Sequence, residues 1–421
     1  MFLMSADGPD ANSKKNSNDT VENKDYKEDL DRTIYYTKKL LRLLGVWSLV
    51  KKENPRKKEL AMSVILITTC SLQVSFIMVP CILHVLLREK NVLIKIKLLA
   101  PIGVRAINLV KYCMLVYRRN VIKFCFDHVE HDWIIAPTDL DRKIMRRNAN
   151  TGRRITLACV LFMYTSTWLF NGILPLVRGN KIDSLNRTIR PLAYPGYDLF
   201  VDSQSSPFYE FIYCNTVVSA WVLYTIIATT CSLAAIFVAH TCGQIEIIMS
   251  RLDTLFDNLD DEIATLEQRV SFIVRSHVRV LRLVSKIEEA LNEILFMEVA
   301  TSTSTICLLE YYCVREWQDS DNLAVFTYFL LLLSYSLSLF IFCHIGELLK
   351  ERCSLIGKAT YLTDWWKMPG KTGRALILVI LTANIPRQLT AGRMIELSVA
   401  SFGAIMKTSV VYLNMLRTMN I

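Results

Sequence analysis

The sequence lacks any Cys-x-x-Cys pair, although it contains 12 cysteines. Zinc ribbons and small disulfide-stapled domains are built on such closely spaced pairs, so the pattern excludes both. Most of the cysteines lie inside apolar runs, as Cys231 and Cys343 do, and there cysteine behaves as a small hydrophobic residue. The N-terminal stretch also lacks the apolar core of a signal peptide, so we expect the first membrane span to direct its own insertion.

No combination of residues supports catalysis or nucleotide binding. The stretch PGKTGR resembles the end of a phosphate-binding loop, but that motif needs glycine five positions before Gly370, and Trp365 stands there. Cys125, His128 and His131 have helical spacing but no fourth ligand for zinc. Neither a carboxylate–histidine nor a serine–histidine arrangement is recognisable. We therefore expect no catalytic residue, no cofactor and no metal site.

The composition points to a membrane protein with sizeable polar segments. The 421 residues are 52% hydrophobic and 21% charged, and the mean hydropathy of +0.30 is too apolar for a typical soluble protein. The formal charge is +10. However, the basic residues lie beside apolar runs rather than in one patch among aromatics, so nucleic acid is not an expected partner.

Seven apolar stretches are long enough to cross a bilayer, which requires about 20 residues each. The second is the weakest, because Lys95, Lys97, Arg105 and Lys111 interrupt it, and a buried soluble helix is the alternative there. The seven stretches are 60–87, 91–117, 155–177, 208–239, 291–313, 323–344 and 394–417. The pattern predicts an all-α membrane protein with seven transmembrane helices.

The charges beside the spans set the expected orientation. Basic residues concentrate in 118–154 and 345–393, which share a side with the N-terminus. Cytoplasmic segments of membrane proteins carry such an excess, so we expect a cytoplasmic N-terminus and an extracellular C-terminus. The glycosylation sequence at Asn186 then lies outside and can carry a glycan, whereas the one at Asn18 lies inside and cannot.

A dense set of motif residues lies between Cys343 and the C-terminus. It comprises Cys343, Gly346, Glu347, Ser354, Ala359, Tyr361, Trp365, Pro369, Pro386, Leu389, Thr390, Ala391, Gly392, Ser398, Phe402, Lys407, Thr408, Tyr412 and Leu416. In these residues the sequence resembles the insect odorant receptor family. The resemblance implies a ligand-gated, non-selective cation channel in the plasma membrane of sensory neuron dendrites. Because the loop between spans four and five is compact, it implies a tuning subunit that binds a small volatile apolar odorant and forms a heterotetramer with the odorant co-receptor subunit.

Two other classes of receptor, gustatory-type channels and G-protein-coupled receptors, are the alternatives to this resemblance. A gustatory-type ligand-gated channel shares the architecture but usually carries a Thr-Tyr pair near its end, where Val411-Tyr412 stands. A G-protein-coupled receptor has the opposite orientation. Its Asp-Arg-Tyr after the third span and its Asn-Pro-x-x-Tyr in the seventh are both absent.

The resemblance also divides the chain into segments with expected roles. They are a disordered cytoplasmic tail (1–32), an amphipathic interfacial helix (33–58), spans one to six with a cytoplasmic helical hairpin at 243–290 (59–344), a cytoplasmic inter-subunit anchor (345–393) and a pore-lining seventh helix (394–421). The anchor is expected around Tyr361, Trp365, Pro386 and Leu389, with ordinary packing inside one subunit as the alternative.

A tetrameric pore needs one helix of each subunit at its axis, and the last helix suits this role. At about 100° per residue, one stripe of that helix carries Ser401, Thr408, Val411, Met415 and Thr418. Apolar rings gate by dewetting and hydroxyls help a hydrated ion to pass, so we expect the constriction at Val411 and Met415. Packing of this stripe against other spans is the alternative.

The ligand pocket of this family lies among spans two, three, four and six in the outer half of the bundle. A small apolar ligand calls for an aromatic pocket with few polar groups. The candidate residues here are Tyr164, Thr165, Trp168, Leu169, Tyr213, Thr216, Val217, Ala220, Phe326, Tyr328, Leu331 and Tyr335. Each of them also suits a lipid-facing or core position.

Overall fold

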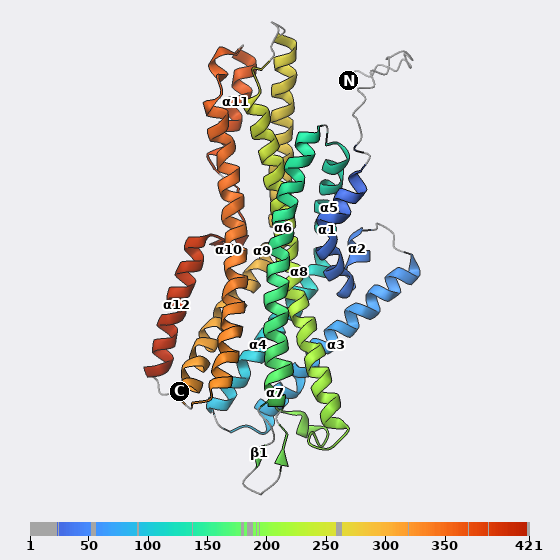
Figure 1. Ribbon diagram of the computed structural model, residues 1–421, viewed down its shortest axis with the longest axis vertical. Helices are drawn as coiled ribbons and strands as arrows, with labels where there is room; N and C mark the ends of the chain where they lie inside the picture. The colour runs from blue at the N-terminus through green and yellow to red at the C-terminus, as the bar shows by residue number, and fades with distance from the viewer. Residues whose placement is uncertain are drawn as a thin grey trace, which may run out of the picture.

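The computed structural model is a bundle of long helices (Figure 1). It describes residues 23, 25–51, 56–90, 92–136, 138–177, 181–182, 188–190, 192, 194–257, 263–318, 320–368, 370–385 and 387–418. Asn18, Asn186 and Pro386 lie outside the described residues, as does the stretch 258–262 within the predicted helical hairpin.

Each of the seven predicted spans corresponds to a helix, although the seventh begins at Val399 rather than at residue 394, and the third continues past its helix to Val177. These helices are α3 (Lys57–Leu87), α4 (Val92–Tyr117), α6 (Asp139–Thr167), α8 (Phe208–Asp253), α9 (Ile263–Gln318), α10 (Asn322–Leu362) and α12 (Val399–Thr418). Helices α8, α9 and α10 have 46, 56 and 41 residues, at least twice the length of about 20 that a bilayer requires. They therefore continue well beyond the membrane, where α8 and α9 remain in contact.

Shorter elements connect and cap these helices. The helical ones are α1 (Tyr26–Leu43), α2 (Trp47–Lys51), α5 (Arg119–Ile134), a π-helical turn (Trp168–Ile173) that continues into α7 (Leu174–Val177), two 3-10 turns (Tyr197–Leu199 and Trp365–Lys367) and α11 (Gly370–Ala383). Two antiparallel hairpins pair β1 (Lys181–Ile182) with β2 (Thr188–Ile189), and β3 (Thr390–Ala391) with β4 (Ile395–Glu396). The second hairpin leads the chain from α11 into α12.

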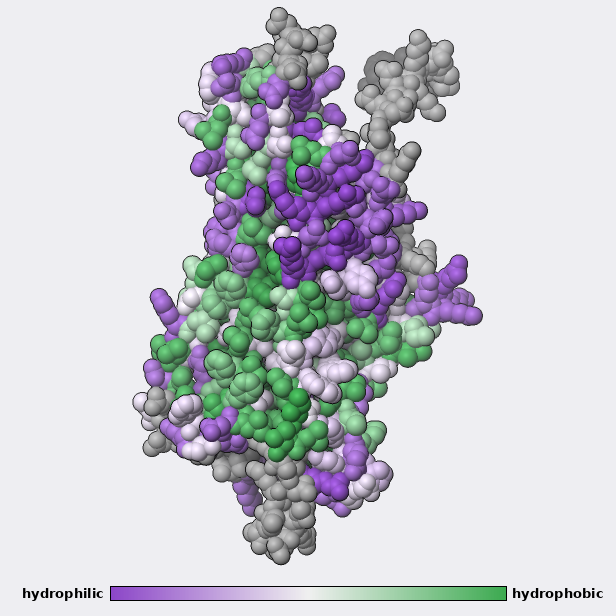
Figure 2. All heavy atoms as spheres, viewed as in Figure 1, coloured by the Kyte–Doolittle hydropathy of each residue, from purple (hydrophilic) through white to green (hydrophobic). Residues whose placement is uncertain are grey.

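The apolar surface lies around one half of the bundle. Among the described residues, six helices have the length and apolar composition to cross a membrane, namely α3, α4, α6 with its continuation to Val177, α8, α9 and α10. The seventh predicted span, α12, contacts α9 and α10 and lies in the same half (Figure 1). Figure 2 shows the apolar face there, with hydrophilic residues above it and at its lower end. The polar half, which holds α1, α5 and α11, is called the N-terminal side below.

The structure corrects the prediction for the N-terminal segment. Helix α1 begins at Tyr26, inside the stretch 1–32 that we expected to be disordered, and the chain turns at Gly45, whose φ is +74°. One face of α1 is buried in the bundle, and Asp29 accepts two hydrogen bonds, of 2.7 and 2.8 Å, from Arg146 of α6. The many charged residues of this stretch suggested disorder, but some of these charges bind the bundle.

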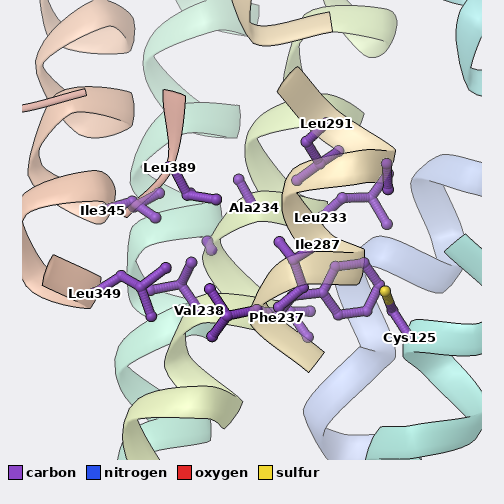
Figure 3. Packing of buried hydrophobic residues seen from close by; sticks show 14 of the residues in the cluster. Cys125, Leu233, Ala234, Phe237, Val238, Ile287, Leu291, Ile345, Leu349 and Leu389 are labelled. Carbon is purple, nitrogen blue, oxygen red and sulfur yellow. The ribbon is translucent and has the colours of Figure 1, made fainter. Parts of the chain in front are cut away.

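Helix α8 forms the centre of the bundle. In its most apolar 18-residue window, 94% of the residues are buried, against 28–50% for the other five candidate spans. Figure 3 shows how Leu233 and Phe237 of α8 pack among apolar side chains of α5, α9 and α10 and the segment before α12. Leu389, predicted for the anchor, belongs to this buried cluster with an exposure of 1%.

A glycine allows the closest approach between α10 and the start of α12. A Cβ placed on Gly346 would lie 2.3 Å from the carbonyl oxygen of Leu397 and 2.6 Å from its Cβ. No side chain fits in this space, so glycine permits the chain to enter α12 directly against α10.

Replacing this glycine is expected to destabilise the protein. Gly346→Ala forces the two backbones apart, and overpacking of this kind costs about 1–3 kcal/mol. The unfolding temperature of the detergent-solubilised protein should therefore fall. Gly403→Ala in α12 is the matched control, because nothing lies within 4 Å of the added Cβ. Equal unfolding temperatures for both variants and the parent would show that the close approach is unimportant.

Candidate ligand-binding cavity

A cavity of about 330 Å³ lies between α4, α8, α9, α10 and the π-helical turn that follows α6. Its lining residues Tyr312 and Glu316 lie near the end of α9 and Tyr328 near the start of α10. The connection between these two helices is in the apolar half of the bundle (Figure 1). The volume of the cavity is at the lower end of the range of small-molecule sites. The aromatic residues of its wall are Phe170, Tyr194, Tyr224, Tyr312, Tyr328 and Tyr335.

The aromatic side chains of the wall contact one another in two groups. The ring centroid of Tyr328 lies 5.8 Å from that of Phe170 and 5.6 Å from that of Tyr312. The rings of Tyr224 and Tyr335 are 6.2 Å apart, and their hydroxyls are 3.5 Å apart. Such pairs are rigid and present large apolar faces. The wall therefore suits recognition by shape and dispersion.

Polar side chains also line the cavity, namely Arg105 of α4, Asn171 of the π-helical turn, and Thr305 and Glu316 of α9. Arg105 is only 2% exposed, and its guanidinium carbon lies 4.8 Å from the ring centroid of Tyr194. Burial raises the pKa of Tyr194, and the positive charge of Arg105 offsets part of that rise. The Tyr194 phenol is therefore neutral and adds no charge to the wall.

Four of the predicted ligand-binding residues lie in this wall. They are Ala220 of α8 and Tyr328, Leu331 and Tyr335 of α10. The α10 residues recur every three or four positions, which places them on one face of the helix. The sequence pattern was informative here because α10 is a regular helix throughout this region.

The other predicted ligand-binding residues do not line this cavity. Trp168 and Phe326 are about half exposed, at 49% and 56%, and the Tyr213 hydroxyl donates a hydrogen bond to the carbonyl oxygen of Gly172. The remaining ones are Tyr164, Thr165, Leu169, Thr216 and Val217.

A local change of helix geometry explains why α6 presents different residues from those predicted. The sequence pattern assumed a regular α-helix through Trp168 and Leu169. The chain instead forms a π-helical turn over Trp168–Ile173, which widens the helix and changes the facing of the residues that follow. As a result, Phe170 and Asn171 line the cavity.

Helix α4 is span two, which was expected to border the pocket, but none of its residues was named as a candidate, and α9 was not expected there at all. In α9, Thr305 and Tyr312 line the cavity, and in α4 Pro101 and Arg105 do so. From the sequence, Arg105 is interpreted only as a charge that interrupts the second predicted span. An ionisable residue inside a membrane span marks a functional site by default, and that signal could have identified it.

Three acidic residues of α9, Glu293, Glu298 and Glu310, each have a polar partner. Glu298 is buried and pairs with Lys111 of α4 at 2.5 Å. Glu293 accepts bonds of 2.7 and 3.2 Å from Arg118. Glu310 accepts a hydrogen bond of 2.9 Å from the hydroxyl of Ser409 in α12.

One face of α12 packs on the bundle. Ser409, the partner of Glu310, is fully buried. Phe402 packs edge-to-face on Phe340 of α10, with ring centroids 5.4 Å apart. The polar contact therefore joins α12 to α9, and the aromatic contact joins it to α10.

The predicted pore stripe lies largely on the exposed surface of α12. Val411 is 65% exposed and Met415 54%, Thr408 and Thr418 are exposed, and Ser401 is half-buried. Within the single chain, most of this stripe is thus free to face lipid or other subunits.

The predicted anchor residues differ in burial. Tyr361 is 63% exposed, Trp365 is half-buried against the core, and Leu389 is buried. Nearby, Leu378, Leu381 and Ile385 at the end of α11 or just past it are 57–80% exposed. Helix α11 lies at the far end of the N-terminal side, away from the apolar face (Figures 1 and 2), so lipid does not cover these side chains.

Comparison with known proteins gives consistent matches. The sequence model of the 7tm odorant receptor family matches residues 95–410. Odorant receptor 13a of Drosophila melanogaster is 26% identical over 283 residues, which span 62% of this chain and 64% of that receptor. Odorant receptor 9a of Drosophila melanogaster is 27% identical over 54% of this chain and 55% of its own length. The matches thus span less than two thirds of either relative. These relatives are receptors, not enzymes, in agreement with the expectation from the sequence.

The fold matches that of a solved insect receptor. The structure of the olfactory receptor OR5 from Machilis hrabei in complex with eugenol has a TM-score of 0.76 to this chain. It covers 94% of this chain and 100% of its own, at 14% sequence identity. This confirms the predicted helical membrane fold.

Breaking the buried Lys111–Glu298 pair is expected to be strongly destabilising. Lys111→Met leaves an uncompensated carboxylate in the bundle and should cost about 3–5 kcal/mol, whereas the double variant Lys111→Met/Glu298→Met should recover most of this loss. Thermal unfolding of the solubilised protein measures both. The control is Arg118→Met. Its partner Glu293 is 40% exposed, so the loss of this ion pair should lower the free energy of unfolding by about 1 kcal/mol or less. A double variant as unstable as the single one would contradict the pairing.

Proposed function

The chain belongs to the 7tm odorant receptor family of insects, and on that premise we propose that it is a tuning subunit of a ligand-gated, non-selective cation channel. Since its curated relatives are matched over only part of their length, activity, ligand and partners are all parts of this proposal. The channel is a heterotetramer with an odorant co-receptor subunit. The N-terminal side is cytoplasmic, and Asn186 is then extracellular.

The proposed ligand is a small organic molecule that binds in the aromatic cavity. The wall formed by Tyr312, Tyr328 and Tyr335 supports this, because rigid aromatic faces bind a small apolar body by dispersion. The cavity is also bounded by several helices, so a ligand that fills it contacts elements that can shift relative to one another.

The observation that carries the proposal is the position of α9. On one side, Thr305, Leu309 and Tyr312 line the cavity. On another side, Glu310 of the same turn accepts the hydrogen bond of Ser409 in α12. A displacement of α9 by the ligand therefore acts directly on the proposed pore helix. The cavity and α12 are then coupled, because both contact α9 and both favour particular positions of it.

Exposed apolar side chains support assembly with other subunits. Leu378, Leu381 and Ile385 form an apolar surface at the far end of the N-terminal side, and uncovered surfaces of this kind mark interaction sites. Together with Tyr361, we assign them to an inter-subunit anchor that holds the channel while its membrane helices move.

Removing an aromatic side chain from the cavity is expected to weaken the response to ligand. Tyr312→Ala should raise the ligand concentration for half-maximal current by about tenfold or more, since truncation of a well-packed aromatic anchor costs roughly 2 kcal/mol. Currents are recorded in cells that also express the co-receptor. Phe329→Ala is the control, because Phe329 lies on α10 but is 54% exposed. The same shift in both variants would count against the cavity.

Substituted cysteines test the pore helix. Val411→Cys and Met415→Cys should react with a water-soluble thiol reagent during ligand-evoked current and change that current. A cysteine at buried Ser409 should remain unmodified. The chain has natural cysteines, so the parent is treated with the reagent in parallel. Equal modification at all three positions would contradict the assignment of the stripe to a pore.

A further inference from the structure

The guanidinium of Arg105 is buried in the cavity wall without a full set of partners. The side chain is 2% exposed, and neither its Nε nor its Nη2 has a hydrogen-bond partner. Among the described residues, no carboxylate forms an ion pair with it. Its guanidinium lies over the ring of Tyr194, and a contact of this kind stabilises a cation only in part.

Two other cationic residues in or next to α4 form ion pairs with glutamates of α9. Lys111, six residues further along α4, is paired with Glu298, and Arg118, just after the helix, is paired with Glu293. A buried charge without a partner is strongly unfavourable. The unpartnered guanidinium atoms of Arg105 border the aromatic cavity, so an occupant of the cavity can supply the missing acceptor.

The chemistry of the wall narrows the class of occupant. A guanidinium presents a planar fork of donors that matches a carboxylate with two parallel hydrogen bonds. Asn171 also borders the cavity. Its Nδ2 donates to the carbonyl oxygen of Thr167, and its Oδ1 has no hydrogen-bond partner, so this oxygen can accept from a donor elsewhere on the occupant but not from the carboxylate. Glu316 lines the wall as well, but on α9 one turn beyond Tyr312, and it disfavours a second anionic group at its end of the cavity.

From these contacts we infer that the cavity selects a small organic acid whose carboxylate binds Arg105 and whose hydrocarbon part packs on the tyrosines. This inference rests on the proposed function of the cavity as the ligand site. It makes Arg105 the residue that determines the ligand class, while the aromatic wall determines size and shape. A neutral ester or alcohol of the same length leaves the guanidinium without an anionic partner.

Binding to the purified full-length chain in lipid nanodiscs tests this directly. The probes are short straight-chain carboxylic acids, hexanoic acid among them, and their methyl esters, each titrated while thermal unfolding is followed. At least one acid should stabilise the parent at a concentration about tenfold or more below that of its ester, as expected for a charge-assisted hydrogen-bonded pair. Arg105→Gln should abolish this preference.

Matched variants keep the result interpretable. Arg105→Lys retains the positive charge but lacks the planar pair of guanidinium donors, so it should keep part of the preference for acids. This variant replaces Arg105→Gln in the test if the glutamine variant does not fold. Lys95→Gln, a polar change elsewhere on α4, should keep the whole preference. Equal stabilisation by acids and esters, no binding of any acid, or a preference that survives in Arg105→Gln would each overturn the inference.

Currents from cells that express the chain with the co-receptor separate this inference from the proposed function. Acids that bind in nanodiscs but evoke no current would support the assignment of Arg105 and count against the channel. Esters that evoke current while acids neither bind nor activate would support the channel and overturn the assignment.

Discussion

The burial of α8 is the constraint on which the rest of the structure depends. Nearly all of its apolar window is enclosed, and α1, α3, α4, α5, α6, α9 and α10 all contact it. Close packing is possible because Gly152 of α6 faces α8, where a Cβ would lie 2.9 Å from that of Ala239. A helix enclosed on all sides fixes the positions of its neighbours, so the cavity is bounded by elements that are held in place.

Polar groups inside this bundle mark where the helices are joined. Lys111 with Glu298 links α4 to α9, and Glu310 with Ser409 links α9 to α12. Helix α9 thus takes part in both contacts and also in the cavity wall. Since buried polar groups are stable only with partners, these contacts favour particular relative positions of the three helices. Arg105 is one of the buried groups in the described part of the chain that keep polar atoms without a hydrogen-bond partner.

The sequence predicted the helices far better than the cavity. Runs of apolar residues located six helices of the described chain that can cross a membrane and a seventh, α12, beside them, because the bilayer imposes one length and one polarity on each span. Regular helical spacing also placed Tyr328, Leu331 and Tyr335 on the face of α10 that lines the cavity. It did not predict the π-helical turn at Trp168, which has no clear sequence signal. Nor did it place Tyr312 and Tyr194 in the cavity wall, because their orientation depends on how α9 and a distant loop pack. The start of α1 was missed for a similar reason, since its charged residues find partners only in the folded bundle.

A structure of the assembled channel with an activating ligand tests the central claim most directly, namely that occupancy of the cavity moves α9 and, through it, α12. We predict ligand density between Tyr312, Tyr328 and Tyr335, together with a displacement of α12 relative to the ligand-free channel. Ligand density at another place, with this cavity empty and α12 displaced all the same, would contradict it.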